Sequence, residues 1–125
     1  MATKKKSVLI VDDSETNLVL LDALLNDKGW DIQKADSGKA ALDMIRKASP
    51  DLILLDLLMP GIDGNEILDR LKADEKYAGI PVIVISAVHT SQARNTCMEK
   101  GALDYLTKPV NIDQLLKKVE EILNG

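Results

Sequence analysis

The stretch LILLDLLMPGIDG, residues 52–64, is the most informative segment of the chain. It begins with four large aliphatic residues, and an apolar run of this length is typical of a strand that is buried on both faces. The run ends on a carboxylate, Asp56, and the proline and glycines that follow predict a turn. Because the apolar segment fixes the position of this acid, Asp56 is a candidate functional residue.

Outward from this segment, apolar runs of strand length alternate with segments of helical period. This alternation is the pattern of a parallel sheet that is covered by helices on both faces. The predicted strands are residues 8–11, 31–35, 52–55, 82–85 and 103–107. The sequence therefore predicts an α/β fold with a doubly wound, five-stranded parallel sheet and five helices.

The helices are predicted from apolar stripes between the strands. The last helix has the clearest stripe, in which six apolar residues from Ile112 to Leu123 recur at helical spacing. Asn111 is expected to cap this helix, and Asp63 is expected to cap the helix of Ile67. The helix in residues 91–100 has few and small apolar residues, so we expect it to bury little area. Whether it is mobile or merely short stays open at this point.

The composition is that of a single globular domain, which we expect to span residues 1–125. The hydrophobic fraction is 46% and the charged fraction 29%, and the apolar run near the N-terminus is too short for a signal peptide or a membrane span. One cysteine, Cys97, suits a reducing compartment, so a cytoplasmic location is expected. A net charge of −4 and an aromatic fraction of 2% argue against direct nucleic-acid binding.

Chemically active side chains follow four of the five predicted strands. Asp12 and Asp13 follow the first, Asp56 the third, Ser86 the fourth and Lys108 the fifth. Ligands of open parallel sheets bind outside the carboxyl ends of the strands. If the first and third strands are neighbours, three carboxylates therefore converge with a hydroxyl and an ammonium group beside them.

Three carboxylates in one cleft need a counter-charge, because two of them about 4 Å apart repel by roughly 4 kcal/mol at an effective dielectric constant of 20. Mg²⁺ suits such a site, since it binds one or two carboxylates and also accepts phosphate oxygens. One carboxylate is then free to attack phosphorus. Asp56 is the expected nucleophile, because it is the single acid at the end of the central strand. Ser86 and Lys108 would bind the phosphoryl oxygens.

Each of these residues has a simpler interpretation when it is taken alone. Asp13 could cap the helix of Leu18, Ser86 could be a turn or helix cap, and Lys108 could be a solvated surface lysine. The joint occurrence of five such residues at four strand ends is hard to explain by caps.

The segments VLIVDDS, DLILLDLLMPGIDG, PVIVISA and GALDYLTKP together resemble the receiver domain of bacterial response regulators, in the stand-alone form of chemotaxis proteins. The resemblance covers essentially the whole chain. It implies a flavodoxin-like sheet of strand order 2-1-3-4-5, and a role as a phosphoryl-accepting switch in a two-component phosphorelay. It implies as well that the chain catalyses its own phosphorylation and slow dephosphorylation.

The resemblance also implies a role for each site residue. Asp56 would accept a phosphoryl group from the phosphohistidine of a sensor histidine kinase or of a histidine phosphotransfer protein. Asp13 and Asp56 would bind Mg²⁺ directly, Asp12 would act mainly through water, and the backbone carbonyl of Leu58 would complete the protein ligands.

A second group of residues would carry the signal. Ser86 would be the switch hydroxyl, Tyr105 the switch aromatic and Lys108 the phosphate-binding lysine, with a cis peptide bond to Pro109. When Ser86 moves to bond the phosphoryl group, Tyr105 could fill the vacated space and reshape the surface of the fourth helix, fifth strand and fifth helix. This surface would control a downstream protein, and the chain would be a monomer or a phosphorylation-dependent dimer.

Leu58 and Val88 predict a long-lived phosphoryl group, because neither aliphatic side chain can orient the water that hydrolyses it. The position of Leu58 also argues against a magnesium-dependent phosphatase of the haloacid-dehalogenase type, which places a second aspartate there. A flavodoxin-like cofactor binder would want glycines and hydroxyls where this chain has DDSETN. The remaining alternative is a degenerate receiver that acts only as a protein-binding module.

Overall fold

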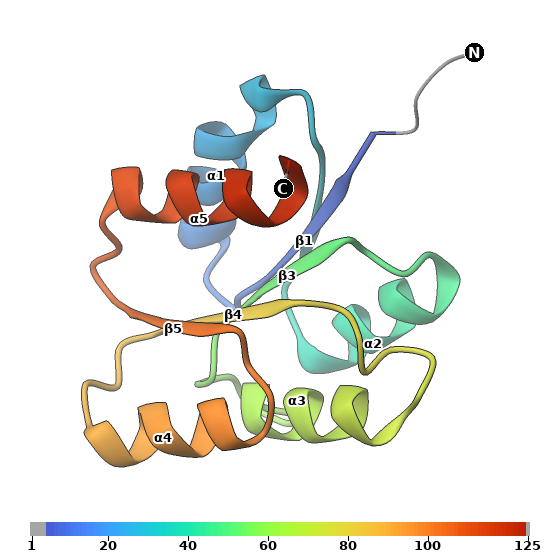
Figure 1. The fold of residues 1–125 in the computed structure, drawn as a ribbon, viewed down its shortest axis with the longest axis vertical. Helices are drawn as coiled ribbons and strands as arrows, with labels where there is room; N and C mark the ends of the chain where they lie inside the picture. Colours follow the sequence, from blue (N-terminus) through green and yellow to red (C-terminus); the bar gives the residue numbers. More distant parts are fainter. Residues whose placement is uncertain (1–4, 125) are drawn as a thin grey trace.

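The structure is a computed structural model that describes residues 5–124. Its centre is a five-stranded parallel sheet of order β2-β1-β3-β4-β5 (Figure 1), which confirms the predicted fold class and strand order. The strands are β1 (Ser7–Val11), β2 (Asp31–Ala35), β3 (Leu52–Leu55), β4 (Val82–Ser86) and β5 (Asp104–Thr107). Strand order reverses between the neighbouring strands β1 and β3, so the carboxyl ends of these two strands meet at the point where ligands of such sheets bind.

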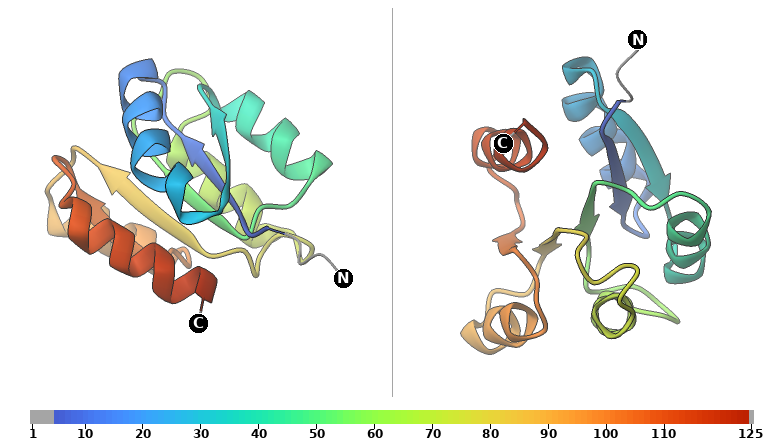
Figure 2. Two further views of the ribbon diagram at one scale, coloured as in Figure 1. Left: turned by 90° about the horizontal axis from the view of Figure 1, so that it is seen from above. Right: turned by 45° about the vertical axis from the view of Figure 1, so that its right-hand side comes forward.

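Helices cover both faces of the sheet. The helices are α1 (Glu15–Leu25), α2 (Gly38–Lys47), α3 (Gly64–Ala73), α4 (Ser91–Glu99) and α5 (Ile112–Asn124), with a short 3₁₀ turn at Asn26–Lys28. Figures 1 and 2 show α1 and α5 on one face and α2, α3 and α4 on the other. Among the described residues, no helix is both long enough and apolar enough to cross a bilayer.

The apolar run of β3 is unbroken because both of its faces are buried. Leu52 and Leu54 pack into the core beneath α1 and α5, whereas Ile53 and Leu55 pack into the core beneath α2 and α3. None of the four is more than 1% exposed. The strand therefore delivers Asp56 to the edge of the sheet from a position that two cores hold rigidly.

Local signals in the sequence account for several helix ends. The predicted caps are confirmed, since Asp63 accepts a hydrogen bond from the N–H of Glu66 at 3.0 Å and Asn111 accepts one from the N–H of Gln114 at 2.9 Å. The interpretation of Asp13 as a helix cap is wrong. The side chain of Ser14 caps α1 instead, which leaves the carboxylate of Asp13 outside the helix.

The structure differs slightly from the predicted strand ends in β4 and β5. Ser86 is the last residue of β4 rather than the first residue after it, because it pairs with Thr107 and its carbonyl accepts a hydrogen bond from the N–H of Lys108 at 2.8 Å. Leu103 lies before β5, and its side chain is exposed.

Helix α4 buries little apolar area, as the sequence predicted. Cys97 is its one buried residue. Polar contacts attach the helix instead: Arg94 donates to the carbonyl of Tyr105 at 3.1 Å, and Lys100 forms an ion pair with Asp69 at 3.3 Å. This helix is therefore held less firmly than α1 or α5.

Helix α3 begins against the backbone that carries Asp56, and this contact makes Gly64 a sensitive position. A Cβ atom on Gly64 would lie 2.3 Å from the carbonyl oxygen of Asp56, which is backbone and cannot rotate away. We expect Gly64→Ala to lower the free energy of unfolding by about 2 kcal/mol, as other forced overpacking does. Urea denaturation measures this change.

The matched control is Gly79→Ala, since nothing lies within 4 Å of a Cβ atom there. This control should change the stability by less than about 0.5 kcal/mol. Equal stabilities of the two variants would contradict the packing that is described for α3.

Candidate functional site

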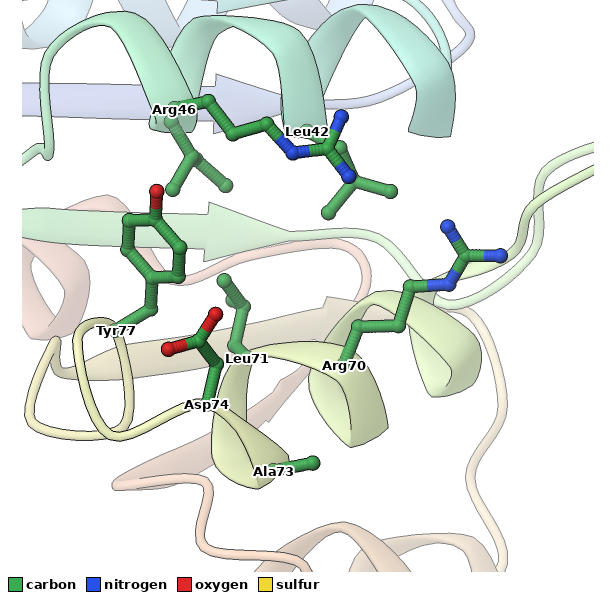
Figure 3. A pocket seen from close by; sticks show the side chains of 8 residues that line it. Leu42, Arg46, Arg70, Leu71, Ala73, Asp74 and Tyr77 are labelled. Carbon is green, nitrogen blue, oxygen red and sulfur yellow. The ribbon is translucent and has the colours of Figure 1, made fainter.

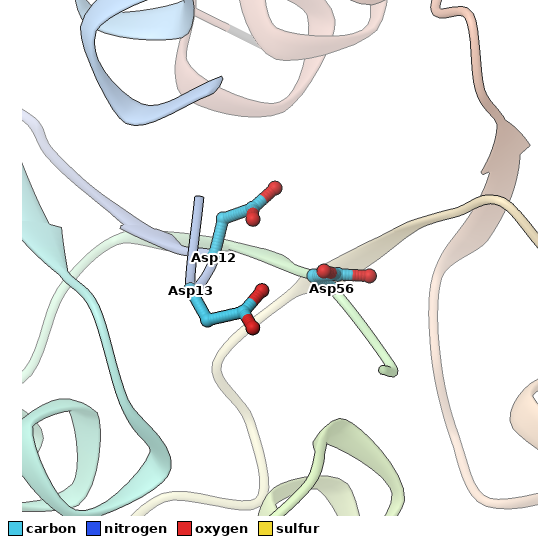
Figure 4. A group of neighbouring side chains, drawn as sticks. All are labelled: Asp12, Asp13 and Asp56. Atoms are coloured by element: carbon cyan, nitrogen blue, oxygen red, sulfur yellow. The ribbon is translucent and has the colours of Figure 1, made fainter. Parts of the chain in front are cut away.

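Three carboxylates meet at the carboxyl edge of the sheet (Figure 4). Asp12 and Asp13 follow β1, and Asp56 follows β3. One carboxylate oxygen from each residue lies within 4.8 Å of the other two. Asp12 and Asp56 are buried, whereas Asp13 is exposed. The structure therefore brings together the three acids that the sequence pattern singled out, and it leaves one side of the cluster open to solvent.

Asp12 is held by hydrogen bonds to both of its carboxylate oxygens. Its Oδ1 accepts from the N–H of Ser14 at 2.9 Å. Its Oδ2 accepts from the side-chain amide of Asn17 at 3.2 Å and from the ammonium group of Lys108 at 3.1 Å. These three donors fix the orientation of the carboxylate.

Lys108 is the cation of the site. Its Nζ lies 3.1 Å from Asp12 Oδ2 and 3.5 Å from Asp56 Oδ2, so a single ammonium group bridges two buried acids. Burial raises the pKa of Asp56 above its ordinary value, and the charge of Asp12 adds to this effect. Lys108 and the N–H of Leu58 act in the opposite direction but do not cancel it. The protein therefore bears an electrostatic cost at Asp56 when its carboxylate is ionised.

The predicted switch residues meet at the backbone of Val88. The hydroxyl oxygen of Ser86 accepts a hydrogen bond from the N–H of Val88 at 3.0 Å. The hydroxyl of Tyr105 donates to the carbonyl of the same residue at 2.7 Å. The Tyr105 side chain is already buried while Ser86 is bonded to the loop. Ser86 and Tyr105 are thus linked through one loop residue in this structure, and the movement expected of them on phosphorylation stays a prediction.

Two further predicted residues complete the surroundings of Asp56. The peptide bond between Lys108 and Pro109 is cis. The N–H of Leu58 donates to Asp56 Oδ1 at 3.3 Å, and the Leu58 side chain is 58% exposed. The loop after β3 thus lies directly against the acid.

The cluster fits a hard divalent cation by the chemistry of its donors. Carboxylate and carbonyl oxygens are the ligands that Mg²⁺ and Ca²⁺ prefer, and the described residues near the cluster supply no sulfur or imidazole ligand to it. Mg²⁺ retains several waters, so the open side at Asp13 also suits it. The structure therefore shows an acidic cluster that could hold a metal ion.

Sequence analysis did not single out Ser14 and Asn17, the two residues of α1 and its cap that donate hydrogen bonds to Asp12. Their position in DDSETN, within the first helical turn after the two acids, was the available signal. A polar side chain three residues after a helix cap often reaches back to the backbone N–H of the cap, so the motif alone does not favour contact with Asp12.

Among the hollows on the described surface, one lies away from the site and another adjoins it. A cavity of about 340 Å³ separates α2 from α3, with Arg46, Arg70 and Tyr77 around it (Figure 3), and none of its lining residues belongs to the acidic cluster. A second cavity of about 230 Å³ adjoins the site, where apolar residues of α1 face Lys108 and Pro109. The second hollow places an apolar surface directly next to the acids.

The raised pKa of Asp56 has a measurable effect on stability. An acid whose pKa is higher in the folded state destabilises the fold once it is ionised, and this cost is lost as the pH falls through the raised pKa. We expect Asp56→Asn to raise the midpoint of thermal unfolding by a few degrees at pH 7.5 without added metal. The difference should shrink as the pH is lowered toward 4.

Asp36→Asn is the matched control, because its side chain is exposed and lies outside the cluster. It should leave the midpoint unchanged at every pH. Thermal unfolding followed by circular dichroism measures both variants, and an Asp56→Asn protein that is less stable than the wild type at pH 7.5 would contradict the electrostatic interpretation.

Comparison with known proteins places this geometry in a family. The chain is 36% identical to Protein PilH of Pseudomonas aeruginosa over 118 residues, which cover 94% of this chain and 98% of that protein. It is 34% identical to the polar-differentiation response regulator DivK of Brucella ovis, again over 94% of this chain and 96% of that protein. It is 39% identical to the response regulator PleD of Caulobacter vibrioides, of which it spans 25%.

Solved structures give the same result. A putative response regulator from Chloroflexus aurantiacus superposes with a TM-score of 0.90 at 34% identity, over 98% of this chain and all of that one. The Vibrio cholerae chemotaxis protein CheY4 superposes with a TM-score of 0.88 at 28% identity, over 96% of this chain and all of that one. Finally, the sequence pattern of the family described as the response regulator receiver domain matches residues 8–120. The chain belongs to this family and is a receiver domain of two-component signalling.

Proposed function

We propose that Asp56 accepts a phosphoryl group from the phosphohistidine of a sensor histidine kinase or a histidine phosphotransfer protein. The observation that carries this proposal is the convergence of Asp56 with Asp12, Asp13 and the ammonium group of Lys108 at the switch point of the sheet. A carboxylate oxygen of Asp56 attacks phosphorus, the P–N bond breaks, and its electron pair stays with the departing imidazole.

Mg²⁺ is the cation that we expect at this site. Asp13 and Asp56 would bind it directly, Asp12 through water, and the backbone carbonyl of Leu58 would complete the protein ligands. When bound, the cation neutralises charge on the acids and on the phosphoryl oxygens. The chain itself supplies the fixed orientation of Asp12 and the rigid strand that presents Asp56.

Lys108 and Ser86 would bind the product. The ammonium group bridges Asp12 and Asp56 in this structure, and a shift toward the phosphoryl group would exchange one of these carboxylate contacts for a phosphoryl oxygen. The hydroxyl of Ser86 accepts a hydrogen bond from the N–H of Val88 and can still donate its own O–H to the phosphoryl group, so a shift of Ser86 toward that group would also move the loop at Val88. Because Tyr105 holds the carbonyl of the same residue, movement of this loop changes the contacts of α4 and β5.

The surface of α4, β5 and α5 would then control a downstream protein partner, with the chain as a monomer or as a phosphorylation-dependent dimer. The weak apolar attachment of α4 supports this assignment, since an element held by few contacts shifts at low cost. We place the switch in the cytoplasm, where its one cysteine, the buried Cys97, would stay reduced.

Two rival functions are weaker. A degenerate receiver that only binds proteins would not need to retain Lys108 on the two buried acids. A phosphatase would need an acid/base group two residues after Asp56, where Leu58 stands. Turnover of free phosphomonoesters should therefore be negligible.

The direct test is phosphorylation by acetyl phosphate. We expect intact mass spectrometry to show the gain of one phosphoryl group in the presence of Mg²⁺, little gain in excess EDTA, and none in Asp56→Asn. A gain that survives this substitution, or no gain in the wild-type chain under any condition, would count against the proposal. Asp36→Asn again serves as the matched control and should be phosphorylated normally.

The lifetime of the phosphoryl group tests the role of the aliphatic residues. Side chains that orient the attacking water should accelerate hydrolysis of the phosphoryl group. We therefore expect the double variant Leu58→Asn, Val88→Glu to release phosphate about tenfold faster, which corresponds to one added hydrogen bond. The backbone bonds of Val88 need not change. Leu103→Asn, an equally exposed leucine beside β5, should leave the rate unaltered. Release at the wild-type rate from the double variant would exclude this role.

A further inference from the structure

Asn17 lies on the first turn of α1 and contacts Asp12 of the acidic cluster. Its side-chain nitrogen Nδ2 donates to Asp12 Oδ2 at 3.2 Å. Its backbone N–H donates to the hydroxyl oxygen of Ser14, whose own N–H donates to Asp12 Oδ1 at 2.9 Å. The first turn of α1 is thus built onto Asp12 through both carboxylate oxygens.

Asp12 Oδ2 accepts hydrogen bonds from two donors, of which one is neutral and one is charged. Asn17 donates from one neighbour and Lys108 from another, at 3.2 and 3.1 Å. Lys108 also lies 3.5 Å from Asp56. The ammonium group is therefore engaged by two carboxylates at the time when a phosphoryl group, if it arrives on Asp56, would need it. The side chain of Asn17 is neutral, and among the described residues its amide donates to Asp12 alone.

We propose that Asn17 is a positioning residue for phosphoryl transfer. It keeps Asp12 Oδ2 hydrogen-bonded and correctly oriented when Lys108 departs, and it thereby lowers the cost of moving the ammonium group to the phosphoryl oxygens. Without this amide, Lys108 is the sole side-chain donor to Asp12 Oδ2 and is retained there, because an oxygen of a buried carboxylate that loses its last donor pays a desolvation cost, even though Oδ1 still accepts from the N–H of Ser14. This inference rests on the function proposed for Asp56.

The position of Asn17 separates this role from a purely structural one. Its side chain is half-buried, and Ser14 caps α1 through the backbone of residue 17, so the cap survives a change of side chain. Asn17→Leu keeps the shape of the side chain but removes the donor. Asn17→Gln keeps the donor. Thr16→Leu changes the neighbouring exposed residue on the same turn and is the matched control.

Two measurements on the full chain test the proposal. The first is the rate of Asp56 phosphorylation by acetyl phosphate at saturating Mg²⁺. The second is calorimetric titration of the unphosphorylated protein with MgCl₂ alone, which reports the orientation of Asp12 without any phosphoryl chemistry. Thermal unfolding is followed in parallel.

We expect Asn17→Leu to phosphorylate about tenfold more slowly than the wild type, the size of one charge-assisted hydrogen bond, and to bind Mg²⁺ about threefold more weakly. Asn17→Gln should recover to within about threefold of the wild-type rate, since its amide can still donate. Thr16→Leu should match the wild type in both measurements.

The proposal is overturned if Asn17→Leu phosphorylates at the wild-type rate, or if the Leu and Gln variants are equally slow, since shape rather than the donor would then matter. A fall in thermal stability of Asn17→Leu with an unchanged rate overturns it as well. Failure of the wild-type chain itself to become phosphorylated would instead refute the function proposed for Asp56, and the Mg²⁺ titration would still test the contact with Asp12.

Discussion

The structure is organised around the concentration of negative charge at one edge of the sheet. Asp12 and Asp56 are buried side by side at the ends of β1 and β3, and Lys108 reaches them from the loop after β5. Like charges in a partly buried site are tolerated only when cations or donors compensate them. Burial of Asp56, together with the charge of Asp12, outweighs the effect of Lys108, so the pKa of Asp56 stays raised. A further positive charge at the cluster would relieve this cost.

The acidic site and the surface of α4, β5 and α5 have different mechanical properties. The acids stand on strands whose side chains fill two cores, so they are held rigidly. Helix α4 depends on polar contacts. Asp104 of β5 links two helices in this way, because it forms ion pairs with Lys118 of α5 and with Arg94 of α4. Burial alone would raise the pKa of Asp104, but hydrogen bonds from Lys118 and from the N–H of Tyr105 lower it. A polar joint of this kind can rearrange without opening a core.

Most of the fold could be read from the sequence because its elements are locally encoded. The alternation of apolar runs and helical stripes predicted the five strands to within one residue at each end and the five α-helices by their apolar positions, with Asp63 and Asn111 as caps. The alternative interpretation of Asp13 as a cap fails for a physical reason. Adjacent Asp and Ser side chains both satisfy the chemistry of a cap, and only the backbone path decides which of them reaches the N–H of Asn17.

The residues themselves were enough to identify the acids, the hydroxyl and the lysine. In a parallel sheet the carboxyl ends of all strands lie at the same edge, and ligands bind at that edge. The contacts that orient these groups come from folding alone. Asn17 approaches Asp12 from a helix, and Tyr105 meets Ser86 through the backbone of Val88, so neither contact follows from spacing along the chain. Strand order and apolar period are properties of the chain, whereas the sharing of one carboxylate oxygen by two donors arises only when distant elements are packed together.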